Sequence, residues 1–299
     1  MSDIPTLDDI RAAAERIRGH AHRTPVLSSR SVDAIAGASL YFKCENLQRV
    51  GAFKFRGATN AVRKLSEADV ARGVATHSSG NHAAALALAA RQRGCPAWVV
   101  MPSNAPPVKR AAVAGYGATI VECEPTLAAR ESTLERVVAE TGATFIHPYN
   151  HPDIIAGQGT AALELLTDHP DLDVILAPVG GGGLMSGTAI AAAGLRDRGE
   201  VNGDLRILGA EPEGADDAAR SLQEGRIVPS VDPQTVCDGL LTSLGTLTYA
   251  ALSTHLETII TVSEEAILRA LRLVLERMKV VVEPSAVVPL GAVLEGKVD

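Results

Sequence analysis

Residues 174–184 read Val174-Ile-Leu-Ala-Pro-Val-Gly-Gly-Gly-Gly-Leu184, and an Ala-rich segment continues from there to Arg198. The apolar run before the glycines predicts a buried strand, and the Ala-rich segment after them predicts a helix. Flexible linkers are also rich in glycine, but a linker is not expected between a buried strand and a helix. We therefore interpret residues 174–198 as a strand, a tight turn and a helix.

The same alternation extends along the chain in both directions. Strands are predicted at Ala97–Met101, Thr119–Cys123, Thr144–His147, Val174–Val179, Ile207–Glu211 and Thr258–Val262. Helices are predicted at Ile10–Ile17, Asn81–Arg93, Thr126–Thr141, Leu184–Arg198 and Glu264–Met278. Apolar strands that alternate with helices predict an α/β fold whose parallel sheets are covered on both faces. Because no long linker is present, we expect any second domain to be inserted within the first.

The composition excludes several classes of function. A net charge of −7 argues against a nucleic-acid partner or an anionic membrane partner. No apolar run reaches the roughly 18 residues of a membrane span, and the N-terminus has no signal-peptide pattern, so we expect a cytoplasmic protein. Four cysteines lie far apart and predict buried, reduced thiols instead of a zinc site or a disulfide framework.

The glycines at positions 180–183 favour a phosphate site. At a turn between a strand and a helix, glycine allows several main-chain N–H groups to converge on an anion, and the helix dipole adds to the attraction. No Lys-Ser/Thr pair follows the glycines, and the spacing of a dinucleotide site is absent. A single phosphate monoester fits this pattern best.

Two further segments carry candidate chemistry. Residues 51–58 read Gly-Ala-Phe-Lys-Phe-Arg-Gly-Ala, in which Lys54 is either an exposed strand lysine or a reactive amine in an apolar setting. Residues 77–82 read His-Ser-Ser-Gly-Asn-His and precede a predicted helix. Their hydroxyl and amide groups suit a helix cap as well as a site for a carboxylate and a cofactor hydroxyl.

Taken together and in this order, these motifs resemble the fold-type II pyridoxal-5′-phosphate (PLP) enzymes, in the branch of threonine/serine dehydratases and serine racemases. The resemblance covers nearly the whole chain. It also includes Lys43-Cys-Glu-Asn-Leu-Gln48, Ala156-Gly-Gln-Gly-Thr160, Cys237-Asp-Gly239 and Val282-Glu-Pro-Ser285. It implies a tryptophan synthase β-like fold with two parallel or mixed sheets, a large PLP-binding domain (1–72 and 150–299) and a small mobile domain (73–149). We also expect a homodimer.

The resemblance implies a role for each of the following residues. Lys54 forms the Schiff base with the cofactor, and Ser79 is a second catalytic residue. The cofactor-binding residues are Phe53, Lys54, Asn81, Gly180, Gly181, Gly182, Gly183, Leu184 and Gly239. The substrate-binding residues are Ser78, Ser79, Asn81, His82 and Arg130.

The implied substrate is a small β-hydroxy amino acid. The leading prediction is an ammonia-lyase (dehydratase) that converts L-threonine or L-serine to 2-oxobutanoate or pyruvate and ammonia. Serine racemase with dehydratase side activity is the nearest alternative, and hydroxyaspartate dehydratase is a third. An inactive amino-acid-binding relative is the alternative from another class.

Residues 211–217, Glu-Pro-Glu-Gly-Ala-Asp-Asp, predict a cation site. Carboxylates six residues apart around a loop suit a hard cation, although a solvated acidic loop has the same pattern. Racemase-like members of the family bind Mg²⁺ or Ca²⁺ at positions that match Glu211, the Ala215 carbonyl and Asp217.

Two departures from the family pattern are visible. Val50 and Ala52 replace the Thr and Ser often found ahead of the lysine. No Ser/Cys-Gly-Gly-Asn turn, whose side chain meets the pyridine nitrogen in the family, follows the predicted helix Ser285–Glu295. We therefore expect that helix to pack on the sheet, with no strand after it and with a gap beside the ring nitrogen.

Overall fold

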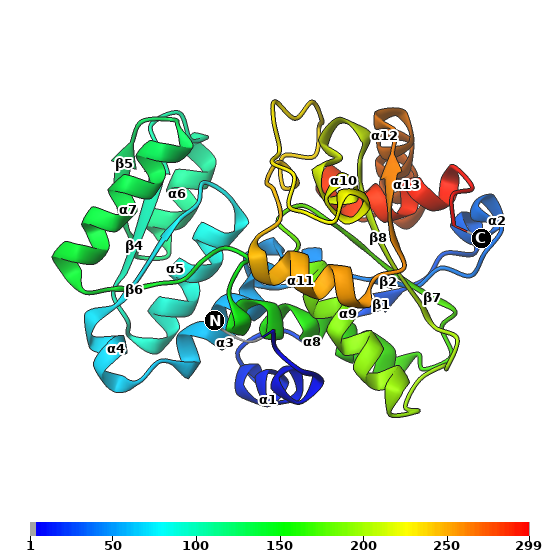
Figure 1. The fold of residues 1–299 in the computed structure, drawn as a ribbon, viewed down its shortest axis with the longest axis horizontal. Helices are drawn as coiled ribbons and strands as arrows, with labels where there is room; N and C mark the ends of the chain where they lie inside the picture. The colour runs from blue at the N-terminus through cyan, green and yellow to red at the C-terminus, as the bar shows by residue number, and fades with distance from the viewer. Residues whose placement is uncertain (1–3, 299) are drawn as a thin grey trace.

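The computed structural model describes residues 4–298 and contains three sheets. Two are parallel, and the third is an antiparallel ribbon of β1 (Val26–Leu27) and β2 (Phe42–Lys43). Helices flank both parallel sheets, which lie on opposite sides of the molecule (Figure 1). The predicted α/β fold class with parallel sheets is thus confirmed.

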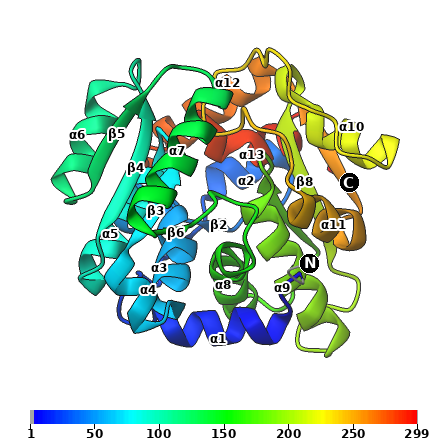
Figure 2. The ribbon, with the colours of Figure 1, turned by 60° about the vertical axis from the view of Figure 1, so that its left-hand side comes forward.

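The first parallel sheet has the strand order β5-β4-β3-β6. Its strands are β3 (Val74–His77), β4 (Ala97–Pro102), β5 (Thr119–Cys123) and β6 (Thr144–Phe145). The helices of this part are α4 (Glu67–Arg72), α5 (Asn81–Arg93), α6 (Pro107–Gly115) and α7 (Leu127–Thr141), of which α5, α6 and α7 contact the strands. Helix α5 is rich in alanine and mostly buried, because it packs on the sheet and on α3 at the same time (Figure 2).

The second parallel sheet has the order β7-β8-β9, with β7 (Val174–Pro178), β8 (Arg206–Pro212) and β9 (Thr258–Val262). The helices of this part are α8 (Pro152–Asp168), α9 (Gly183–Asp197), α10 (Asp217–Glu224), α11 (Thr246–His255), α12 (Glu264–Leu273) and α13 (Val288–Leu294). Three further helices, α1 (Leu7–Ile17), α2 (Arg30–Ala36) and α3 (Lys54–Lys64), come from the N-terminal part of the chain.

Close packing at glycine positions joins α3, α8 and α9. A Cβ atom at Gly157 would lie 2.5 Å from the Cα atom of Gly57, and one at Gly187 would lie 2.5 Å from the main-chain nitrogen of Gly159. Any side chain at these positions would separate the helices. The Ala-Gly-Gln-Gly motif therefore serves helix packing, and it fixes α3, the helix that begins at Lys54.

Several elements differ from the sequence prediction. Strand β3 and helix α8 were not predicted, and the segment predicted as one helix at Glu264–Met278 is α-helical only to Leu273, with a π-helical turn after it. The C-terminal prediction is confirmed in part: the helix packs on the sheet, as α13 against β8 and β9, but it spans Val288–Leu294 instead of Ser285–Glu295, and a 3₁₀ turn at Pro284–Val287 precedes it. Lys54 begins a helix, so its interpretation as an exposed strand lysine was wrong.

The division into a large domain and an inserted small domain stays a prediction, although the strands between residues 74 and 145 form a sheet of their own.

All four cysteines are free and buried, as expected. Within residues 4–298, no helix combines the length and the apolar character that crossing a membrane requires.

Candidate active site

A cavity of about 1610 Å³ brings together the residues predicted to bind cofactor and substrate. Its wall includes the ends of β3 and β7, where parallel sheets commonly bind ligands. All the predicted cofactor and substrate residues line it: Phe53, Lys54, Ser78, Ser79, Asn81, His82, Arg130, Gly180, Gly181, Gly182, Gly183, Leu184 and Gly239. Residues that are far apart in the chain thus meet at one site, as motif order alone had suggested.

Lys54 has the environment of a reactive amine. Its Nζ atom donates a hydrogen bond of 3.0 Å to the carbonyl oxygen of Pro148 and lies 5.2 Å from the centre of the Phe53 ring. No carboxylate pairs with it among the described residues. Burial therefore lowers its pKa to about 8, because desolvation disfavours the ammonium form. About a tenth of the amine is therefore neutral, and hence nucleophilic, at pH 7, far more than for an ordinary lysine.

The Pro148 carbonyl, which accepts the hydrogen bond from Lys54, belongs to a turn at Ile146–Asn150. The Nδ1 atom of His147 accepts hydrogen bonds from the main-chain nitrogens of Tyr149 (3.2 Å) and Asn150 (2.9 Å). Burial lowers the pKa of His147 to about 3, and the nearby charges of His77 and Lys54 act in the same direction. His147 is therefore neutral. The sequence analysis did not single out this histidine, which no motif marks.

The segment at residues 77–82 connects β3 to α5. Ser79 and Asn81 lie at the N-terminal end of α5 and face the cavity. The Asn81 amide donates to both carboxylate oxygens of Glu283 at 3.1 and 3.0 Å. His82 is almost fully buried, and its Nδ1 atom has no hydrogen-bond partner among the described residues. The loop thus presents hydroxyl, amide and imidazole groups at a helix N-terminus, which favours an anion.

The glycine loop connects β7 to α9. Among the described residues, no acceptor is found for the main-chain N–H groups of Gly180, Gly181 and Gly182. Gly182 has a φ of 83°, and a Cβ atom at Gly181 would lie 2.5 Å from the ring of Tyr149. Only glycine fits here, and the unpaired N–H groups at the start of α9 suit an anion such as a phosphate.

A third part of the wall comes from Gly239 and from the loop before α13. The Ser285 hydroxyl accepts a hydrogen bond of 3.2 Å from the main-chain nitrogen of Gly239. Glu283 and Ser285 both line the cavity, although only their shared motif, not their roles, was noted from the sequence. The prediction of a gap beside the ring nitrogen stays a prediction.

Arg130 and His77 add nitrogen donors to the side of the cavity next to the first sheet. Arg130 donates through Nε to the carbonyl oxygen of Thr126, and its terminal nitrogens have no partner among the described residues. His77 stacks on Phe145 and contacts the edge of His147. Burial, and then the charge of Arg130, lowers the pKa of His77. His77 was not predicted as a site residue, because in the sequence it belongs to a segment typical of a turn.

The predicted cation-site residues lie outside the cavity wall. Glu211 and Asp217 are buried, and Glu211 accepts from the main-chain nitrogens of Ala218 (3.3 Å) and Ala219 (2.6 Å). Burial raises the pKa of Glu211 to about 8 and raises that of Asp217. The Oδ2 atom of Asp217 has no partner among the described residues. Within residues 4–298, no cluster of three or more His, Cys, Asp or Glu side chains that could hold a metal is found. The predicted site has only two such side chains, Glu211 and Asp217, and its third ligand is the main-chain carbonyl of Ala215.

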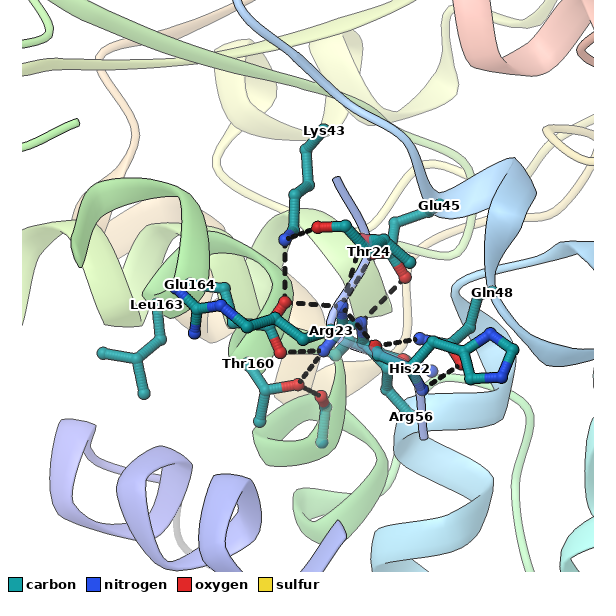
Figure 3. A network of polar contacts seen from close by, with 12 residues as sticks. His22, Arg23, Thr24, Lys43, Glu45, Gln48, Arg56, Thr160, Leu163 and Glu164 are labelled. Carbon is teal, nitrogen blue, oxygen red and sulfur yellow. Dashed lines mark hydrogen bonds and ion pairs between the residues drawn. The ribbon is translucent and has the colours of Figure 1, made fainter. Parts of the chain in front are cut away.

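A buried ion network holds the start of α3 (Figure 3). Arg56, fully buried, donates to both oxygens of Glu45 and to both oxygens of Glu164 at 2.8–2.9 Å. Lys43 donates to Glu164 and to the carbonyl oxygen of Thr24, each at 2.7 Å. Two positive and two negative charges therefore balance inside the protein, two residues away from Lys54.

Comparison with known proteins agrees with this arrangement. The family model described as "Pyridoxal-phosphate dependent enzyme" matches residues 17–299. A β-hydroxyaspartate dehydratase from Paracoccus denitrificans is 49% identical over 98% of this chain and 91% of its own length. The solved structure of the serine racemase from Dictyostelium discoideum is 46% identical, with a TM-score of 0.93 over 98% of this chain and 92% of that chain.

A further solved structure, a threonine deaminase from T.th., is 44% identical, with a TM-score of 0.91 over 98% of this chain and 94% of that chain. Dehydratases, deaminases and racemases of amino acids are thus all similar to this chain. The chain belongs to the fold-type II family of pyridoxal-phosphate dependent enzymes, in its dehydratase and racemase branch.

Proposed function

We propose that the protein is an ammonia-lyase for 3-hydroxyaspartate, which it converts to oxaloacetate and ammonia. The relatives support hydroxyaspartate dehydratase and serine racemase better than the threonine/serine dehydratase that the sequence analysis placed first. The carrying observation is the pair Arg130 and His77, whose nitrogen donors line the cavity that contains Lys54. A second carboxylate on the substrate gives these donors a partner.

The cavity fits pyridoxal phosphate. The unpaired N–H groups of the glycine loop suit the phosphate, Asn81 suits the 3′-hydroxyl, and the buried Lys54 suits covalent attachment to the aldehyde. When bound, the cofactor supplies an electron sink for the electrons of the substrate Cα–H bond. The protein supplies binding, orientation and proton transfer.

Different residues of the chain carry out proton transfer and substrate binding. The amine of Lys54, neutral in part at neutral pH, is the general base that takes the Cα proton. Ser78 and Ser79, in the loop at the start of α5, bind the α-carboxylate, because a helix N-terminus favours an anion. The neutral His82 has one N–H group, which the Ile146 carbonyl accepts, so His82 supports the loop and does not donate to the substrate. Arg130 and His77 then bind the β-carboxylate and hold the β-hydroxyl in place for elimination.

A second candidate function is serine racemisation. Ser79 lines the cavity, and its hydroxyl is the residue type that could exchange a proton on the face of Cα opposite Lys54. The serine racemase relatives support this candidate as well.

A cation at Glu211, the Ala215 carbonyl and Asp217 is also part of the proposal, since the unpartnered Asp217 oxygen suits an oxygen-ligated Mg²⁺ or Ca²⁺.

The decisive experiment is a substrate panel with the cofactor-loaded protein. L-threo-3-hydroxyaspartate, L-serine, D-serine and L-threonine are each assayed for release of keto acid and for change of enantiomer. We expect kcat/KM for elimination to be about 10- to 100-fold higher for hydroxyaspartate, because charged hydrogen bonds contribute roughly 1.5–3 kcal/mol. Faster turnover of L-threonine or L-serine, or conversion of L-serine to D-serine as the main reaction, contradicts the proposal.

A further inference from the structure

We propose that the turn Ile146–Asn150 aligns Lys54 with the glycine loop, and that His147 is the positioning residue that holds this turn. The inference uses the assignment of Lys54 in the proposed function, but it holds for any amino-acid substrate. The turn contacts Lys54 on one side and the glycine loop on the other.

The imidazole of His147 fixes the peptide groups of the turn. Its Nδ1 atom accepts from the main-chain nitrogens of Tyr149 and Asn150, so that this nitrogen carries no proton. The same arrangement orients the carbonyl of Pro148, which accepts the hydrogen bond from Lys54 at 3.0 Å. A neutral His147 is therefore required for the turn to keep the geometry that receives the lysine.

Contacts outside the turn anchor its two ends. At one end, the Nε2 atom of His82 lies 3.3 Å from the carbonyl oxygen of Ile146. At the other end, the side-chain oxygen of Asn150 accepts a hydrogen bond of 2.8 Å from the main-chain nitrogen of Leu247. The first contact is buried and the second is partly buried, and together they give the turn a defined position relative to α5 and α11.

The turn also contacts the glycine loop. The Tyr149 ring packs so closely on Gly181 that a Cβ atom there would lie 2.5 Å from the ring. The ring also meets the edge of His147, with the two ring centres 4.6 Å apart. One short segment thus touches the lysine on one side and the predicted phosphate site on the other, and it sets the distance between them.

Loosening the turn has a measurable consequence for Lys54. When the turn moves away, less of the protein shields the amine from water, and its pKa rises from about 8 toward the ordinary value of 10.5, because desolvation is what lowers it. The neighbouring titratable side chains are His82 and His147, and burial keeps the pKa of each well below its ordinary value. The neutral fraction of Lys54 at neutral pH then falls, and Lys54 reacts more slowly with an aldehyde.

The test measures how fast the full chain, freed of cofactor, captures pyridoxal phosphate across a range of pH. In His147→Asn, the amide oxygen replaces Nδ1 as the acceptor for the two N–H groups, as Asn commonly does in turns. In His147→Phe, a ring remains but the acceptor is lost. His151→Phe is the matched control, because His151 accepts from Asp153 through Nδ1 in the same way, outside the cavity wall.

We expect the midpoint of the capture profile to rise by about one pH unit in His147→Phe, with roughly tenfold slower capture below the midpoint. His147→Asn and His151→Phe should keep the midpoint of the unmodified protein, even where they unfold at lower temperature. An unchanged midpoint in His147→Phe, or equal shifts in all three variants, overturns the proposal. Borohydride reduction and peptide mapping identify the capturing lysine, and label on a lysine other than Lys54 overturns both this inference and the assignment of Lys54. A wrong substrate assignment leaves capture unaffected.

Discussion

The Nζ atom of Lys54 donates to the carbonyl oxygen of Pro148, 94 residues further along the chain, at 3.0 Å. This bond connects the first residue of α3 with the turn after β6. It gives a buried amine one polar partner without supplying a negative charge. The lysine therefore keeps a pKa of about 8, which suits both nucleophilic attack and proton transfer near neutral pH.

Replacement of Lys54 by Ala should abolish covalent cofactor binding and turnover. The fold should persist, because the side chain faces a cavity and makes one hydrogen bond. Absorbance and borohydride trapping measure attachment, and circular dichroism checks the fold. Lys64→Ala is the control, since Lys64 is half exposed and pairs with Asp153. Trapped cofactor in Lys54→Ala contradicts the assignment.

Replacement of Arg130 by Gln, or of His77 by Leu, should lower kcat/KM for hydroxyaspartate by about tenfold or more, since each removes a donor to a carboxylate. Turnover of L-serine, which has no second carboxylate, should change much less. Arg136→Gln on the same helix is the control, because Arg136 is exposed and pairs with Glu140. Equal losses for both substrates count against a β-carboxylate site.

Replacement of Ser79 by Ala distinguishes elimination from racemisation. Lys54 removes the proton from one face of an L-amino acid, whereas inversion requires a donor on the other face. We expect elimination of L-serine to survive in this variant better than formation or elimination of D-serine. Chiral chromatography and keto-acid release provide the comparison. If all three activities fall equally, Ser79 is a binding residue and the racemase hypothesis loses its main support.

Bound Mg²⁺ should stabilise the protein more at pH 8 than at pH 5. Burial raises the pKa of Glu211 to about 8 from its ordinary 4.5, so the folded state binds the proton more tightly. Without a cation, the free energy of unfolding therefore falls as the pH rises from 4.5 to about 8. A cation that pairs with the ionised carboxylates reverses this loss. At 100 times the Kd, binding contributes about 2.7 kcal/mol.

Thermal midpoints in EDTA and in millimolar Mg²⁺ at the two pH values test the cation prediction. Glu211→Gln provides the matched variant, because it keeps the shape of the side chain and removes the charge. Its midpoint should not respond to Mg²⁺. A midpoint of the unmodified protein that is equally insensitive at pH 8 excludes a cation at this site.

Replacement of Arg56 by Met should destabilise the fold by about 3–5 kcal/mol, because it leaves Glu45 and Glu164 without their main partner inside the protein. Arg23→Met is the control: Arg23 pairs with Asp168 at the surface, and such pairs contribute at most about 1 kcal/mol. Urea unfolding of both variants gives the two free energies. A loss below about 1 kcal/mol for Arg56→Met means that the network does not stabilise α3.

Much of the site could be predicted from the sequence, because its parts are local. The glycine loop after an apolar run, the Ser-Ser-Gly-Asn segment before α5 and the lysine between two phenylalanines each carry a short-range signal. The residues chosen from these motifs all line one cavity. The residues that were missed carry no such signal. His147 becomes a site residue only through its two hydrogen bonds within the turn, and His77 only through its place beside Arg130.

The sequence by itself determined the alternation of strands and helices and the types of residue available for chemistry. Periodicity and turn composition act over a few neighbours, so these features can be read along the chain. Only the tertiary structure decided which groups are buried and which pairs meet. The pKa of Lys54 depends on desolvation by distant segments, and its one polar partner comes from a turn 94 residues away. Desolvation and hydrogen bonding depend on distances in space, which no local pattern in the sequence contains.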